Sequence, residues 1–213
     1  MIPLSPAVVE AIEKLRSRRA ALFRVAQAVM NADHPKLYVL DLLAIATLNR
    51  ALCLLKGYAE LVGQQNMICA APLLRCQLDN VLRFSASMLV ERPHDFAAEI
   101  LRGAAIKDLK DRDGKRMTDS YLVTQVSKEY PWVAAVYKSA SGYVHLSEKH
   151  IVNTITPGSA DGSMDIKVTE QDGPGWTEHL YLEAIEAFGA ITDLVVEIMD
   201  AWALTKSRAA NGN

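Results

Sequence analysis

Apolar side chains recur every three or four positions over most of this chain, which is the spacing of one face of an α-helix. The first such stretch begins at Ser5-Pro6, where serine suits the N-cap and proline suits the first helical position. It runs to His34-Pro35, where proline disfavours helix in the residue before it. The same periodicity predicts further helices at about 36–64, 67–91, 94–110, 118–129, 131–142 and 176–206.

The pattern changes at residues 151–170. Residues 151–156 and 164–169 alternate apolar and polar side chains at a period of two, and they flank a turn-rich segment at 157–163. This arrangement predicts a β-hairpin. The expected fold class is therefore mainly α, a helical bundle of about six to seven helices with a small inserted β-hairpin near 151–170. We expect residues 1–206 to form a single helical domain and residues 207–213, which are small and polar, to form a flexible tail.

Composition narrows the class of protein. The chain has 213 residues, is 50% hydrophobic and carries a formal net charge of −2, which argues against a broad basic surface for nucleic acid. The longest apolar run, at 67–74, is interrupted by Arg75 before it reaches membrane-spanning length. The three cysteines form no CxxC motif, so we expect free thiols in a reducing compartment. These features predict a cytoplasmic protein with no membrane partner.

Charged residues interrupt the apolar helix at 67–91. Arg75, Asp79 and Arg83 are spaced four apart and therefore share one helix face. One interpretation is an internal ion-pair stripe that fixes helix register, because a desolvated charge needs a partner. The other is the floor of a polar site, with Arg75 as the anion binder, because its guanidinium offers a planar fork of donors.

The densest polar cluster lies at residues 137–150. Lys138, Ser141 and His145 are three and four apart and would share a face if the sixth helix continues through them. His145 can act as an acid or base near neutral pH. Lys138 could stabilise phosphate charge, while Ser141 and Tyr137 could orient a substrate or the imidazole. The alternative is that His145 is a hydrogen-bonded structural histidine beneath the hairpin.

Metal and cofactor motifs are missing from the sequence. The segment from His145 to His150 is one residue longer than the HxxEH pattern, and two histidines five apart do not share a helix face. The glycines and serines fit no GxxxxGK[ST], GxGxxG or GxSxG motif. We therefore predict no metal site and no cofactor.

Two segments carry a family resemblance. The segment Ala-Ala-Pro-Leu-Leu-Arg75-Cys-Gln-Leu-Asp79 resembles the LLRxxxE/D helix of the DUF5677-like group of bacterial proteins, and Tyr137-Lys-Ser-Ala-Ser141-Gly-Tyr-Val-His145 resembles that group's YxxxSxxxH element. The group is similar in architecture to HEPN domains. These are helical bundles, often dimeric, found in bacterial toxin and anti-phage systems, and many are metal-independent RNases that use an Arg and a His.

The resemblance implies two functional hypotheses. In the first, the chain is a non-catalytic binding or regulatory module with a polar pocket around Arg75 and His145, in which Asp79, Tyr137 and Ser141 also bind. The alternative is a metal-independent RNase of toxin or phage-defence type, in which His145 is the general acid and base while Lys138 or Arg75 holds the phosphate. The resemblance also implies a homodimer and an RNA or nucleotide partner.

Overall fold

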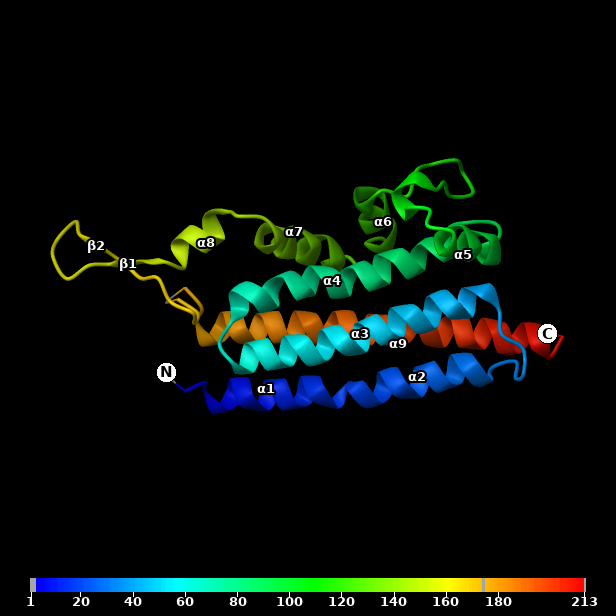
Figure 1. The fold of residues 1–213 in the computed structure, drawn as a ribbon, viewed down its shortest axis with the longest axis horizontal. Helices are drawn as coiled ribbons and strands as arrows, with labels where there is room; N and C mark the ends of the chain where they lie inside the picture. The colour runs from blue at the N-terminus through cyan, green and yellow to red at the C-terminus, as the bar shows by residue number, and fades with distance from the viewer. Residues whose placement is uncertain (1–2, 174, 213) are drawn as a thin grey trace.

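The computed structural model describes residues 3–173 and 175–212, and its long helices lie side by side in a bundle (Figure 1). The bundle comprises α1 (Pro6–Ser17), α2 (Arg19–Asn31), α3 (Val39–Gly63), α4 (Met67–Ser85) and α9 (Glu178–Ala210). Shorter elements cover α3 and α4 or project from the bundle: η1 (Ala86–Met88), α5 (Pro93–Leu101), η2 (Ile106–Asp108), α6 (Asp119–Val126), α7 (Trp132–Val144), α8 (Glu148–Val152), β1 (Ile155–Pro157) and β2 (Met164–Ile166). The expected mainly α fold with a small β-hairpin is confirmed.

The core fills the space between the five long helices. Its centre holds the rings of Tyr58 from α3 and Phe188 from α9, which stack with centroids 4.1 Å apart. Both side chains are fully buried, and aliphatic residues from each long helix surround them. Burial of this apolar surface is the main term that stabilises the bundle.

The first helix is not continuous, contrary to the sequence prediction. It is divided at Arg18, whose backbone N–H bonds to the carbonyl of Leu15, so the chain turns more tightly there than in an α-helix. The guanidinium of Arg18 pairs with Asp193 of α9 through two contacts of 2.9 Å. Gly189 makes room for it, because a Cβ at that position would lie 2.9 Å from the guanidinium carbon.

Several predicted helix ends are also wrong. The helix predicted to reach residue 110 ends at Leu101, because Gly103 takes a positive φ of 95° that stops the helix. The last helix runs through Ala210, so residues 207–210 belong to α9 and not to a flexible tail. Alanines 209 and 210 favour this extension, and Asn211 ends it.

The hairpin is shorter than predicted and is preceded by a helix that the sequence analysis missed. Residues 151 and 152 belong to α8, and the two strands pair antiparallel with Ile155 opposite Ile166. Figure 1 shows α8 and the hairpin projecting beyond the bundle, at the end where the N-terminus lies. No helix in the described part of the chain is long and apolar enough to cross a membrane.

Candidate functional site

Arg75, on the face of α4, is held by contacts from three elements. Its Nη2 lies 2.6 Å from Oδ2 of Asp119 at the start of α6, and its Nη1 lies 3.6 Å from Oδ1 of Asp79. Its guanidinium carbon also lies 4.4 Å from the ring centre of Tyr137 in α7, a cation–π contact. One face and two of the nitrogens of this guanidinium are thus already in contact with protein groups.

The same carboxylates serve two further arginines. Arg83 donates to Asp79 at 3.0 Å and pairs with Asp119, while Arg50 of α3 lies 3.3 Å from Asp79. Three guanidinium groups therefore share two carboxylates. Of the two interpretations of this stripe, the ion-pair network describes the contacts better, since each carboxylate bridges at least two arginines and ties α4 to α3 and α6.

The remaining predicted residues lie on α7 or, in the case of His145, directly after it. His145 and Lys138 are exposed, and neither forms an ion pair or a side-chain hydrogen bond with a residue that the structure describes. Ser141 donates to the carbonyl of Tyr137 at 2.7 Å, a bond within the helix. The helix rise places His145 about 12 Å along α7 from Tyr137. Arg75 instead pairs with Asp119 at the start of α6.

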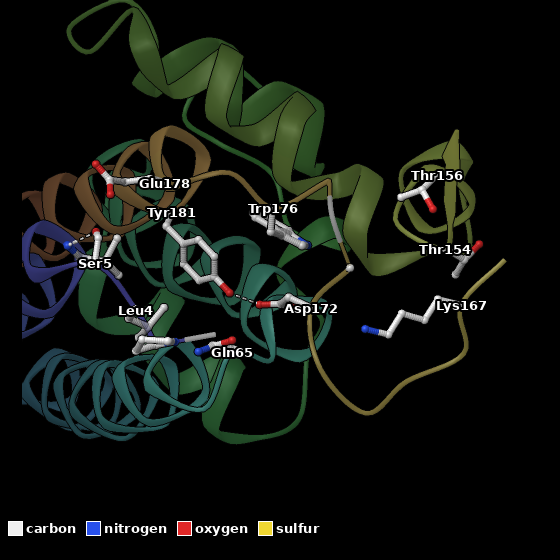
Figure 2. A pocket seen from close by; sticks show the side chains of 13 residues that line it. Leu4, Ser5, Gln65, Thr154, Thr156, Lys167, Asp172, Trp176, Glu178 and Tyr181 are labelled. Carbon is white, nitrogen blue, oxygen red and sulfur yellow. Dashed lines mark hydrogen bonds between the residues drawn. The ribbon is translucent and has the colours of Figure 1, made fainter. Parts of the chain in front are cut away.

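A separate cavity of about 520 Å³ opens beside the hairpin, and sequence reasoning did not find it. Figure 2 shows its walls, which come from parts of the chain far apart in sequence. Leu4 and Ser5 precede α1, Trp176 precedes α9, and Lys167 follows β2. The helices α1, α4 and α9 all begin at this end of the bundle, so their positive dipole ends face the same region.

Asp172 forms the floor of the cavity. Its Oδ1 accepts a 2.6 Å hydrogen bond from the backbone N–H of Met67, the first residue of α4, and its Oδ2 accepts from the hydroxyl of Tyr181. Burial raises the pKa of the Asp172 carboxyl above its ordinary value, although these two hydrogen bonds oppose that effect. Burial likewise raises the pKa of Tyr181, and the bond to Asp172 adds to it. The lone pairs of Asp172 are therefore engaged by the protein itself.

Lys167 and Trp176 line the cavity from two different loops. Lys167 extends toward the interior of the cavity (Figure 2), and its ammonium forms no ion pair within the described ranges 3–173 and 175–212. Nε1 of Trp176 is buried and finds no hydrogen-bond partner there either. The indole ring itself is held between Tyr143 and Tyr181, with centroids 5.6 and 5.9 Å away.

Close backbone packing fixes the base of the hairpin. A Cβ at Gly173 would lie 1.7 Å from the carbonyl oxygen of Asn153, and one at Gly175 would lie 2.2 Å from Oδ1 of Asn153. Only glycine permits this approach. The contact seats the segment before β1 against the segment before α9, and so places Lys167 at the cavity.

Both faces of β2 are exposed, but only one face of the hairpin lines the cavity. Thr154, Thr156 and Lys167 line the cavity, while Met164, Ile166 and Val168 lie outside it with exposed fractions of 69%, 74% and 94%. The alternation follows from the strand period of two. The sequence predicted this alternation but not its direction. The polar face borders the cavity, whereas the apolar side chains of the other face are exposed and lie outside it.

A scan against protein-family models, a search of curated proteins and a search of solved structures found no match to this chain. The resemblance to the DUF5677-like and HEPN-like groups therefore stays a prediction. Within the described residues, no group of three or more His, Cys, Asp or Glu side chains is placed to hold a metal ion.

Proposed function

We propose that this protein is a non-catalytic interaction module that binds a second copy of itself through the outward face of its β-hairpin. The observation that carries the proposal is the exposed apolar face of the hairpin. Met164, Ile166 and Val168 form a row of large apolar side chains that contacts little within the chain, since each is at least 69% exposed. A soluble monomer seldom presents such a row without a partner.

The energy available from this face is sizeable. Full burial of one such side chain stabilises by about 1.5–3 kcal/mol, so the six side chains of two copies could contribute on the order of 10 kcal/mol. Association costs about 4–15 kcal/mol in lost freedom of motion. Burial of this row is therefore sufficient for a stable dimer only when further apolar residues are buried with it. Leu146, before α8, and Ile151 and Val152, within it, are also exposed, with fractions of 88%, 57% and 61%, and would have to join the row in the interface.

The chemistry of the face favours an identical partner. A two-fold axis places the same patch of both subunits in contact, so the patch must be complementary to itself. The apolar row meets this requirement because the charged residues of β2 and its extension, Asp165 and Lys167, lie on the other face of the hairpin. A two-stranded hairpin is also only marginally stable alone, and packing against a second hairpin would support it.

The surroundings of the candidate catalytic residues support a non-catalytic role. A general base normally has a third group that orients it, and the exposed His145 has none among the described residues. Arg75, which would have to stabilise a phosphate, is already paired with Asp119 and stacked on Tyr137. Binding an anion there would require breaking these contacts.

Sedimentation equilibrium tests this function. The wild-type chain should show twice the chain mass of 23.4 kDa at micromolar concentration, and the combined variant Met164→Ser, Ile166→Ser, Val168→Ser should show the single mass. Leu101→Ser and Leu204→Ser are matched controls, because these leucines are 61% and 59% exposed on other surfaces. A wild-type monomer, or a dimer that survives the hairpin variant, would reject the proposal.

A further inference from the structure

The short helix α8 connects α7 to the hairpin, and a histidine side chain closes its first turn (Figure 1). Ser147 occupies the N-cap position of α8. Nδ1 of His150, at the third helical position, accepts a hydrogen bond of 3.2 Å from the backbone N–H of Ser147. This is one half of a capping box, in which glutamate or glutamine usually takes the place of His150. The cap of α8 therefore depends on an acceptor that can be protonated near neutral pH.

Only one form of the imidazole can make this bond. The neutral ring with its proton on Nε2 leaves the lone pair of Nδ1 free to accept, whereas the protonated ring is a donor at both nitrogens. Protonation of His150 would therefore direct one N–H against another. The hydroxyl oxygen of Ser147 lies 3.5 Å from Nδ1, which is too long to replace the cap without movement. The imidazolium would also place positive charge in the first turn of a helix, where the dipole disfavours it.

The helix α8 has little else to hold it. It contains five residues, far fewer than an isolated helix needs to be stable in water. Its remaining ties to α7 come from Lys149, whose ammonium lies 4.3 Å from the ring centre of Tyr143 and donates to the carbonyl of Ser139 at 3.0 Å. Loss of one cap is expected to shift the helix–coil equilibrium of such a helix by about fivefold.

Asn153 couples α8 to the hairpin. Its Nδ2 donates to the carbonyl of Lys149 at 2.9 Å, so the side chain is fixed by the last turn of α8. The same residue packs against Gly173 and Gly175 at the base of the hairpin, and β1 begins two residues later at Ile155. Release of α8 would therefore loosen the contact that seats the hairpin.

Other ionisable side chains border this joint. Tyr143 of α7 contacts the ring of His150 edge to face, with centroids 6.2 Å apart. Burial raises the pKa of Tyr143, and the negative charge of Glu183 on α9 adds to that effect. Glu148 and Lys149 precede His150 on α8 and carry opposite charges. Histidine is the side-chain type whose charge ordinarily changes between about pH 5 and 8, so His150 is the group of this joint that mild acidification alters.

We infer that His150 is a pH-sensitive cap: its neutral imidazole holds α8 in place, and its protonation releases α8 and the hairpin that follows. This control goes beyond self-association, because it acts at the joint between α7 and α8. Only its effect on the dimer rests on the proposed function, since loosening the hairpin would disturb the apolar face formed by Met164, Ile166 and Val168.

Nuclear magnetic resonance on the full chain labelled with ¹⁵N and ¹³C tests the cap directly, in a titration from about pH 8 to about pH 5. At the upper end, the ring nitrogens of His150 should show the Nε2–H tautomer, and the Cα shifts of residues 148–152 should be helical. The helical shifts should decrease on acidification with the same midpoint as the ring of His150. A Nδ1–H tautomer, or helical shifts that stay constant while His150 titrates, would overturn the inference.

Two glutamine variants separate this cap from other effects of pH. His150→Gln keeps a side-chain acceptor at the third helical position but cannot titrate, so its α8 should stay helical throughout. His145→Gln removes the exposed neighbouring imidazole and should keep the response of the wild type. Asp172, whose pKa is raised by burial, is present in both variants, so any effect of its titration would appear in both. A full response in His150→Gln, or none in His145→Gln, would also overturn the inference.

Sedimentation equilibrium at the two ends of the titration separates the cap from the proposed dimer. If the chain self-associates through the hairpin, the dissociation constant of the wild type should rise by about fivefold or more on acidification, while that of His150→Gln should stay constant. A constant wild-type value beside a lost α8 would overturn this coupling. A wild-type monomer at both ends would reject self-association, and the shifts of α8 would still decide whether His150 is the cap.

Discussion

The ammonium of Lys206 lies 2.8 Å from the carboxylate of Asp41 in an ion pair that is almost completely buried, with side-chain exposures of 1% and 0%. The ammonium also donates to the carbonyl of Val29 at 3.0 Å, and the indole of Trp202 donates to Asp41 at 2.8 Å. These bonds join α2, α3 and α9 at the end of the bundle opposite the hairpin (Figure 1). They hold the three helices together at the end of the bundle farthest from the hairpin and the cavity.

This pair yields the first prediction. Lys206→Met leaves a buried carboxylate without its cation, and breaking a buried pair in this way costs about 3–5 kcal/mol. Urea denaturation should show that loss in the free energy of unfolding. Lys107→Met, on the surface, should change it by less than about 0.5 kcal/mol. A loss below about 1 kcal/mol for Lys206→Met would mean that Asp41 is adequately solvated by other groups.

The arginine stripe on α4 gives a second prediction. Asp119 bridges Arg75 and Arg83 and lies at the start of α6, where a negative charge is favourable. Asp119→Asn should therefore destabilise the fold by about 1–2 kcal/mol, less than a fully buried pair because the carboxylate is partly exposed. Thermal unfolding measures the effect, and Asp108→Asn on η2 is the exposed control. Equal melting temperatures for both variants would show that the stripe is not a structural element.

The third prediction concerns pH. Burial raises the pKa of Asp172 above its ordinary value of 3.8, so the folded state holds the proton more tightly than the unfolded state does. Stability from this group is therefore present at low pH and is lost as pH rises from about 4 through the raised pKa. Asp172→Asn cannot ionise at this position. The melting temperature of the variant minus that of the wild type should therefore increase as the pH rises through this range. A constant difference across pH would contradict the proposed raised pKa.

His145 supplies the fourth prediction. Its imidazole is exposed and without a described partner, so His145→Ala should leave the melting temperature within about one degree of the wild type. Cleavage of a labelled RNA by the wild type should also equal that by the variant. RNA cleavage that the wild type performs and the variant lacks would instead favour the RNase hypothesis.

Local features of the fold could be predicted from the sequence because their causes are local. Ser5 caps α1 as expected, and Thr118 caps α6 at the predicted start of that helix; each accepts a bond from a backbone N–H three residues on. The hairpin was visible in the alternation of residues 151–170, although its strands are shorter. Arg75 and Asp79 were correctly placed on one face of a helix, and their contact with each other follows from that spacing alone.

The parts that could not be predicted depend on contacts distant in sequence. Asp119 completes the arginine stripe from 44 residues away, and Lys206 finds Asp41 across 165 residues. The cavity escaped prediction for the same reason, since its lining residues Lys167 and Trp176 lie in loops with no recognised motif. Periodicity also cannot tell which face of a hairpin meets the bundle, because both directions produce the same alternation.

The most direct test of the central proposal is an isotope-filtered nuclear Overhauser measurement on an equimolar mixture of labelled and unlabelled chain. We predict cross-peaks between the methyl groups of Met164, Ile166 and Val168 in one copy and the same residues in the other. Such cross-peaks would be absent from the combined serine variant. No intermolecular cross-peak to these methyl groups, or cross-peaks from a different surface only, would contradict self-association through the hairpin.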